Sequence, residues 1–283
     1  MIRFLVLFIL VCVTAGSAFA GCAGKITNIK AQAPLSYSPF EPFNARQTLV
    51  VTVQNTGTLA CRYQISVPPR FYPLQFGGKL SFSLSGTGVS EGASTPLALT
   101  TPALDPGKST QLPVILTVFR GQATLSGEFA TSVELDLTVV GTTAGNAPVD
   151  QGIVPLTCSV PPVFQINLAG SGHRTSVQFG NLETGQKASV VLQTRTNNDH
   201  RLEFESANRG FLTLREGSGA ASTIPYTATL DGQPLALTAP TALNFSTAPG
   251  EATRRFTVTI GDTSGKLAGI YRDVITVAIL SSM

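Results

Sequence analysis

The segment Ala268-Gly-Ile-Tyr-Arg-Asp-Val-Ile-Thr-Val-Ala-Ile279 decides the fold predicted for this chain. Its second half alternates branched aliphatic residues with small or polar ones, which is typical of a β-strand with one buried face. A similar segment occurs earlier, where Leu125-Ser-Gly-Glu-Phe129 leads into an alternating run over residues 133–140. In both places a strand and a polar loop precede a leucine, a small residue, a glycine and an aromatic residue, and a final strand follows. The chain therefore contains two copies of one structural plan.

The two copies also match at their starts. Cys22 precedes the turn Ser38-Pro-Phe40 in the first copy, and Cys158 precedes the turn Gln178-Phe-Gly180 in the second. Strand-like runs recur throughout with Gly, Pro and Asn between them, and no stretch sustains an apolar period of 3.6 residues. We therefore predict an all-β protein with two immunoglobulin-like β-sandwich domains.

The domain boundaries follow from a change in composition near the middle of the chain. Residues 141–155 are small, polar and rich in turn formers. We predict an N-terminal sandwich at residues 21–145, a linker at residues 146–157 and a C-terminal sandwich at residues 158–283. Each sandwich then has about 120 residues, which is an ordinary size for a domain.

The composition argues against several classes of function. Charged residues make up 12% of the chain and its formal net charge is +3, without the clustered Lys and Arg of a nucleic-acid-binding protein. The two histidines, His173 and His200, lie in polar, turn-like contexts and have no metal-ligand spacing, so we predict solvated side chains. No Gly-x-Ser-x-Gly elbow, P-loop lysine or paired carboxylates can be identified. We expect no enzymatic activity, no cofactor and no metal site.

The first twenty residues have the pattern of an export signal. Arg3 is followed by an apolar run over residues 4–13 and by the small-x-small site Ala18-Phe-Ala20. The run is too short to span a bilayer comfortably. Cleavage after Ala20 would leave three cysteines in an oxidising compartment, which predicts one disulfide and one unpaired cysteine.

The second copy resembles the spore-coat-protein-U domain family, which includes the subunits of archaic, Csu-type chaperone–usher pili. The resemblance lies in Val177-Gln-Phe-Gly180, in Ile224-Pro-Tyr226 and in the Gly-x-Tyr-x-Asp ending quoted above. The first copy keeps Cys22, the Ser-Pro-Phe turn and Cys61, but has Phe129 in place of Tyr271. Together the two copies cover nearly all of the chain that follows the predicted signal.

The resemblance implies a C-terminal sandwich that lacks its last strand. The groove left open in such a pilin is filled first by a strand of a periplasmic chaperone and later by a strand of the adjacent pilin subunit, after passage through an outer-membrane usher. The residues that would line this groove are Tyr271, Ile275, Val277 and Ile279.

The position of Cys22 suggests where in the pilus the protein belongs. With cleavage after Ala20 only Gly21 precedes Cys22. If Cys22 is tied into the first sandwich, as the resemblance implies, no free tail is expected that could complete a neighbouring subunit. We therefore expect a tip adhesin, exported through the periplasm to the cell surface, that attaches cells to abiotic or host surfaces and supports biofilm formation. A non-tip structural pilin or coat subunit, and a secreted carbohydrate-binding module, are the alternatives.

The resemblance favours a disulfide between Cys22 and Cys61, which leaves Cys158 unpaired. A second interpretation stays open, because Phe19-Ala-Gly-Cys22 is also a degenerate lipobox. If Cys22 carried a lipid, Cys61 and Cys158 would be left as a possible pair.

The predicted adhesive loop spans residues 68–76, which are unusually apolar for a loop. It contains Phe71, Tyr72, Leu74 and Phe76 among three prolines. Exposed rings in a stiff loop would mark an interaction patch. The alternative is that these side chains close one end of the sandwich core. A second apolar stretch, at residues 35–43, is the next candidate.

Overall fold

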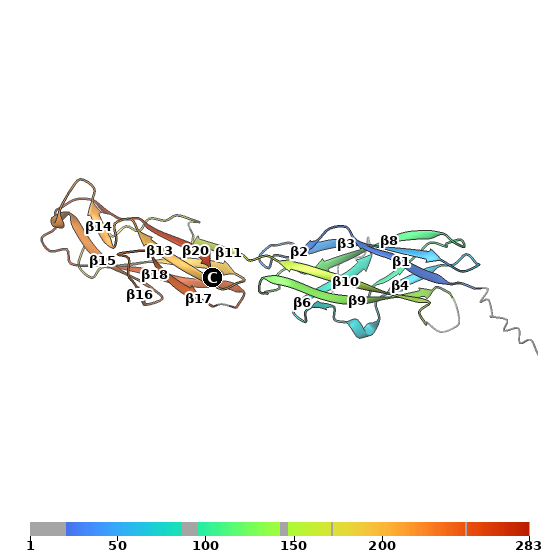
Figure 1. Cartoon of the computed structure of the whole chain (residues 1–283). Helices are drawn as coiled ribbons and strands as arrows, with labels where there is room; N and C mark the ends of the chain where they lie inside the picture. Colours follow the sequence, from blue (N-terminus) through green and yellow to red (C-terminus); the bar gives the residue numbers. More distant parts are fainter. Residues whose placement is uncertain (1–20, 87–95, 142–146, 171, 247, 283) are drawn as a thin grey trace, which may run out of the picture.

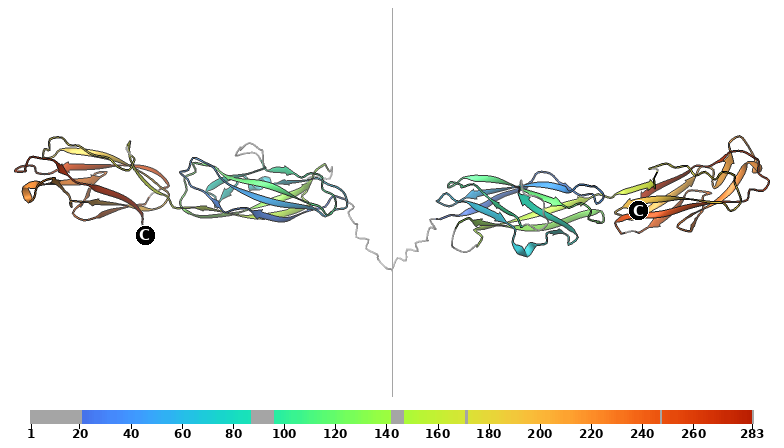
Figure 2. Two further views of the ribbon diagram at one scale, coloured as in Figure 1. Left: turned by 90° about the horizontal axis from the view of Figure 1, so that it is seen from above. Right: turned by 180° about the vertical axis from the view of Figure 1, so that it is seen from behind.

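The computed structural model describes residues 21–86, 96–141, 147–170, 172–246 and 248–282. The predicted signal peptide, residues 1–20, lies outside the described residues. The regular secondary structure of the described residues consists of β-strands and two short 3-10 helices, η1 (Pro69–Phe71) and η2 (Ala220–Ser222), without an α-helix. Two sandwiches follow each other end to end (Figures 1 and 2).

The first sandwich has two five-stranded sheets that enclose one hydrophobic core. The first sheet has the order β1 (Gly24–Ala31), β3 (Ala45–Asn55), β8 (Ser109–Val118), β6 (Leu80–Gly86) and β5 (Gln75–Phe76). The second sheet has the order β2 (Leu35–Ser36), β10 (Asp150–Val160), β9 (Gly127–Val139), β4 (Tyr63–Ser66) and β7 (Ala98–Thr100).

The second sandwich has a larger and a smaller sheet. The larger sheet has the order β11 (Phe164–Leu168), β12 (Lys187–Thr196), β18 (Gly250–Ile260), β15 (Thr223–Leu230), β14 (Phe211–Leu214) and β19 (Tyr271–Arg272), with β16 (Gln233–Leu235) beside β15. The smaller sheet contains three strands, β17 (Thr241–Phe245), β13 (His200–Ser206) and β20 (Ile275–Ser281).

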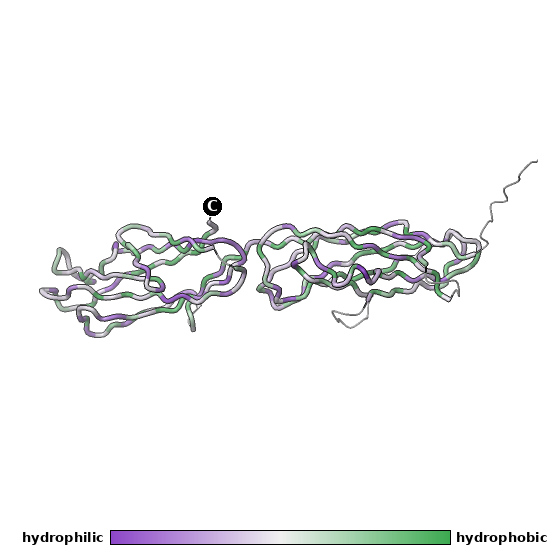
Figure 3. The backbone as a smooth tube through the Cα atoms, turned by 90° about the horizontal axis from the view of Figure 1, so that it is seen from below, coloured by the Kyte–Doolittle hydropathy of each residue, from purple (hydrophilic) through white to green (hydrophobic). Residues whose placement is uncertain are grey.

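Alternation along the strands explains why the two sheets of each sandwich pack face to face. Leu49, Val51 and Val53 of β3 are buried, while the residues between them are partly exposed. Because successive side chains of a strand point to opposite faces, such a pattern places one face in the core and one in water. Figure 3 shows hydrophilic and hydrophobic residues interspersed along the backbone of both sandwiches. The prediction of an all-β protein with immunoglobulin-like sandwiches is confirmed.

The predicted linker is wrong, because most of residues 146–157 belong to a strand of the first sandwich. β10 pairs with β9 in antiparallel register from Asp150 to Val160. Its side chains at Val154, Leu156, Cys158 and Val160 are buried in the first core. Pro155, which suggested a turn, is tolerated because β2 pairs with β10 only at Cys158 and Ser159. We propose that the domain boundary lies at residues 161–163 instead.

Cys158 is consequently not the counterpart of Cys22. It lies in β10, at the end of the first sandwich, and the second sandwich begins after it. The alternation of Val154, Leu156, Cys158 and Val160 was present in the sequence, but the neighbouring Gly and Pro residues outweighed it.

Candidate functional site

The outer edge of β20 is the main structural difference between the two sandwiches. In the first sandwich, β9 lies between β4 and β10. In the second, β20 occupies the place of β9 and pairs with β13, but no described strand pairs with its other edge. Within the described residues the second sandwich therefore has no counterpart of β10, and backbone groups along one edge of β20 have no described strand as a partner.

A hollow lies beside this open edge, between β20 and β11. The two strands are neighbours in space but belong to different sheets and share no ladder. The hollow has a volume of about 500 Å³ and is lined by residues of β11, by His173 and by Ile279 of β20. We call the open edge of β20, the facing edge of β11 and this hollow the acceptor groove.

The three predicted groove residues on β20 are only half-buried. Ile275, Val277 and Ile279 pack against the second core from one side of the strand. The matching positions of the first sandwich, Val133, Leu135 and Leu137 of β9, are at most 2% exposed. The difference in burial has a simple cause, since β10 covers β9 and no described strand covers β20.

Tyr271 does not join the other three predicted residues. It lies in β19, which pairs with β14 in the larger sheet, and its hydroxyl donates to the carbonyl oxygen of Leu267 at 2.7 Å. Its ring packs against the second core, where it holds the turn that precedes β20.

The two cores differ in size as expected if one sandwich is incomplete. Among the described residues, 26 form the buried core of the first sandwich and 11 form that of the second. Several large apolar side chains around the second core are only partly covered, including Ile166 and Leu168 of β11. Covering such side chains would stabilise the sandwich by about 25 cal/mol for each Å² removed from water.

Asp273 holds the start of β20, a role that the sequence analysis did not identify. Its carboxylate accepts hydrogen bonds from the Ser206 hydroxyl at 2.6 Å and from the backbone N–H groups of Asn208 at 3.0 Å and Val274 at 2.8 Å. The Tyr226 hydroxyl also donates to Asp273. Burial, and then the hydrogen bond to Asp273, raise the pKa of Tyr226. Asp273 thus ties β13, β15 and β20 together at one end of the groove.

Gly269 explains another part of the same motif. Its φ of 153° lies in a region that favours glycine. The Gly-x-Tyr-x-Asp pattern therefore has a local structural reason at each of its named positions: a positive φ at Gly269, a hydrogen-bonded turn at Tyr271 and the bonded carboxylate at Asp273.

The cysteines of the first sandwich are arranged as the resemblance implied. Cys22 and Cys61 form a disulfide, with their Cα atoms 5.7 Å apart. Cys158 is free and fully buried, and burial raises the pKa of its thiol to about 11. This arrangement excludes a pairing of Cys61 with Cys158.

The predicted adhesive loop is not an exposed aromatic patch. Leu74 and Phe76 are buried in the first core, which contradicts the exposure on which that prediction depended. Phe71 and Tyr72 are half-buried against the same core, and the Tyr72 hydroxyl accepts a hydrogen bond from the backbone N–H of Leu97. The loop holds apolar side chains that close the sandwich, as the alternative interpretation stated.

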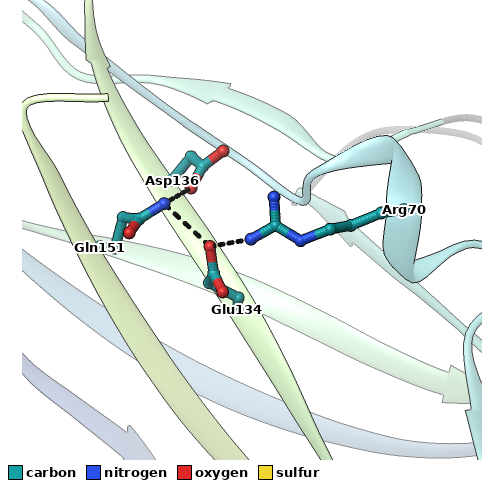
Figure 4. Close-up of polar contacts among 4 residues, drawn as sticks. All are labelled: Arg70, Glu134, Asp136 and Gln151. Carbon is teal, nitrogen blue, oxygen red and sulfur yellow. Dashed lines mark hydrogen bonds and ion pairs between the residues drawn. The ribbon is translucent and has the colours of Figure 1, made fainter. Parts of the chain in front are cut away.

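A polar network fastens this loop to the outer face of the second sheet (Figure 4). Arg70, from η1, forms an ion pair with Glu134 of β9 at 2.5 Å. The side-chain amide of Gln151, on β10, donates to Glu134 at 2.8 Å and to Asp136 at 2.9 Å. The Arg70 side chain is largely exposed, so this ion pair contributes little stability on its own.

The prediction of two solvated histidines is right for His173 and wrong for His200. His173 is exposed. His200 is fully buried and stacks on Phe245, with ring centroids 5.4 Å apart. Burial lowers the pKa of His200, and the nearby charge of Arg254 contributes in the same direction. The sequence missed this because His200 begins a strand whose inward face was not recognised.

Within the described residues, no three His, Cys, Asp or Glu side chains are grouped as metal ligands. Of the described segments, none is a helix with the length and apolar character required to span a bilayer.

Comparison with solved structures finds distant similarity to pilus tip proteins. The chain aligns with the tip adhesion subunit CsuE of the archaic chaperone–usher Csu pili of Acinetobacter baumannii, solved in a pre-assembly complex with CsuC, at 14% identity and a TM-score of 0.40, over 89% of this chain and 99% of that one. The CupB6 tip adhesin from Pseudomonas aeruginosa aligns at 10% identity and a TM-score of 0.40, over 92% and 93% of the two chains.

CfaE, the adhesive subunit of the CFA/I fimbria of enterotoxigenic Escherichia coli, aligns at 11% identity and a TM-score of 0.41, over 83% of this chain and 74% of that one. No family model and no curated protein sequence matches the chain.

Proposed function

We propose that this protein is the two-domain tip adhesin of a chaperone–usher pilus, whose second sandwich accepts a β-strand from another polypeptide. The observation that carries the proposal is the open edge of β20, at the position where the first sandwich of the same chain has β10. The role is adhesive and structural, without catalysis or cofactor.

A donated strand would supply both things that the acceptor groove lacks, a strand partner for β20 and a cover for its apolar side chains. Its backbone can pair with the free edge of β20, and its alternate side chains can cover Ile275, Val277 and Ile279. A strand with apolar residues at every second position fits this requirement, as β10 does in the first sandwich with Val154 and Leu156.

The proposed partners follow from the resemblance to archaic pilus subunits. A periplasmic chaperone supplies the first strand, and the adjacent pilin replaces it during passage through the outer-membrane usher. The protein then lies at the cell surface, at the tip of the pilus. The tip position is proposed because the disulfide at Cys22 and strand β1 hold the chain that follows the predicted cleavage site.

The test is capture by the chaperone, with variants of two adjacent residues on β20. Val277→Asp places a charge on the half-buried face, and we expect at least a tenfold loss of co-purification with a co-expressed pilus chaperone. Thr276→Asp introduces the same charge on the exposed face of the strand and serves as the matched control, with capture unchanged. Equal capture of both variants would refute strand acceptance at this edge.

The adhesive surface is proposed at the end of the first sandwich that lies farthest from the second. Leu59, Val140 and Val149 are exposed by 55%, 42% and 41%. Val140 follows the end of β9, Val149 precedes β10, and Leu59 lies in the loop before β4, which pairs with that end of β9. Val140 and Val149 lie on neighbouring strand ends, since the N–H of Val149 donates to Leu137 and that of Val140 to Arg62. Apolar groups gathered at the end of a rod can lose water against a hydrophobic surface without unfolding the sandwich.

Adhesion is tested with the double variant Leu59→Ser and Val140→Ser. We expect intact pili, an unchanged melting temperature and a severalfold loss of cell attachment to polystyrene. Ile153→Ser is the control, because Ile153 is 71% exposed on the flat outer face of the sheet and not at its end. Attachment that depends on Ile153 and not on the other two residues would place the adhesive surface on the sheet face.

A further inference from the structure

The connection between the two sandwiches is unusually short and stiff. β10 ends at Val160 and β11 begins at Phe164, so only Pro161, Pro162 and Val163 lie between them. Each proline fixes its own φ and restricts the residue before it. A connection of this kind can change direction only within narrow limits.

Asn197, a residue of the second sandwich, forms hydrogen bonds to this connection. It lies in the turn between β12 and β13 and is completely buried. Its side-chain N–H donates to the carbonyl oxygen of Pro161 at 2.9 Å, and its side-chain oxygen accepts the N–H of Val163 at 2.7 Å. One amide therefore satisfies a backbone group on each side of Pro162.

The same residue also contacts the first sandwich directly. The backbone carbonyl of Asn197 accepts a hydrogen bond at 3.0 Å from the N–H of Ser126, which immediately precedes β9. Thr124, two residues before Ser126, is buried. Asn197 thus joins three segments: the loop before β9, the connection and the β12–β13 turn.

We infer that Asn197 is a positioning residue that locks the two sandwiches into one rigid rod. A swivelling joint would have to break two or three of these hydrogen bonds and leave a buried amide without partners, which is unfavourable. The lock also reaches the acceptor groove, because Phe164, the residue after Val163, lines it. A tensile force applied to the second sandwich is therefore transmitted to the first through a connection that does not bend.

The experiment uses pulsed electron–electron double resonance to measure the distribution of distances between two spin labels in the purified full chain. Lys30→Cys and Lys187→Cys place one label on each sandwich at exposed positions. The native cysteines do not interfere, because Cys22 and Cys61 are bonded to each other and Cys158 is buried. Asn197→Ala is compared with Asn198→Ala, a neighbour in the same turn whose side-chain oxygen accepts the N–H of Asp199 within the turn.

We expect one narrow distribution for the labelled parent and for Asn198→Ala, and at least a twofold broader one for Asn197→Ala. A second variant inserts Gly-Ser-Gly between Pro162 and Val163, which leaves the residues of both sandwiches unchanged and should broaden the distribution equally. A parent distribution as broad as that of the insertion variant would overturn the inference. A narrow distribution in Asn197→Ala at an unchanged melting temperature would also overturn it. If Asn197→Ala unfolds the chain, the comparison of the parent with the insertion variant decides whether the connection is rigid or flexible.

Discussion

At the scale of single residues, His200 is the clearest case of a side chain whose surroundings set its chemistry. It is fully buried against Phe245, and the Arg254 guanidinium lies 3.6 Å from the centroid of the same ring. The pKa of His200 is lowered, so the folded protein holds it neutral at pH values where the unfolded chain, with a pKa near 6.5, binds a proton.

We therefore predict that stability is fully present above about pH 6.5 and falls as the pH decreases through that value, by at most about 1.4 kcal/mol per pH unit for one proton. The measurement is urea unfolding of the full chain at pH 5, 6 and 7. His200→Gln should remove this part of the pH dependence, whereas His173→Gln, at an exposed position, should leave it unchanged. If the free energy of unfolding depends on pH equally in His200→Gln and in the parent, another group is responsible for the pH dependence.

At the scale of elements, β20 depends on the clamp at its start. Asp273 accepts hydrogen bonds from two side chains and two backbone N–H groups. Three of these bonds, from Ser206, Asn208 and Tyr226, are partly buried, and Asp273→Ala would leave those donors without their partner. An unsatisfied buried group costs about 1–3 kcal/mol, so we expect a loss of about 3 kcal/mol in the stability of the second sandwich.

The control is Asp262→Ala, because Asp262 is exposed and its carboxylate accepts two hydrogen bonds from Ser264 within its own turn. Its expected cost is below about 0.5 kcal/mol. Hydrogen exchange of the β20 amides locates the effect: they should lose protection in Asp273→Ala and keep it in Asp262→Ala. Similar losses in both variants would mean that Asp273 does not hold the strand.

At the scale of the whole molecule, the two sandwiches are built alike but are not equally complete. The first has the larger core, the disulfide and the strand β10, and the second has neither disulfide nor a described counterpart of β10. We predict two calorimetric transitions for the chain without a partner, with the second sandwich unfolding at the lower temperature.

Two treatments show which transition belongs to which sandwich. Reduction of Cys22–Cys61 should lower only the upper transition, because the bond closes a loop of the first sandwich and such bonds contribute about 2–4 kcal/mol. A chaperone bound in the acceptor groove should raise only the lower transition, as any ligand specific for the folded state does. A single transition that responds to both treatments would contradict separate stabilities and favour one cooperative unit.

The sequence by itself determined the fold class and the duplication, and the family resemblance implied the Cys22–Cys61 pairing. The fold class and the duplication depend on local patterns, since alternation, turn residues and a repeated ending can be read without knowing which strands are neighbours. The same patterns placed Ile275, Val277 and Ile279 on one face of the last strand, and the structure agrees.

Only the tertiary structure decided which strands complete which sandwich. β10 contains Gly152 and Pro155, and the sequence pattern predicts a linker over residues 146–157, but β9 supplies the hydrogen-bonding edge that makes this segment a strand. The burial of Leu74, Phe76 and His200 was equally hidden, because an apolar or polar side chain in a loop-like context has the same local signature whether a sheet covers it or not. Burial and strand partnership are properties of contacts between distant segments, and the sequence pattern of one segment does not contain them.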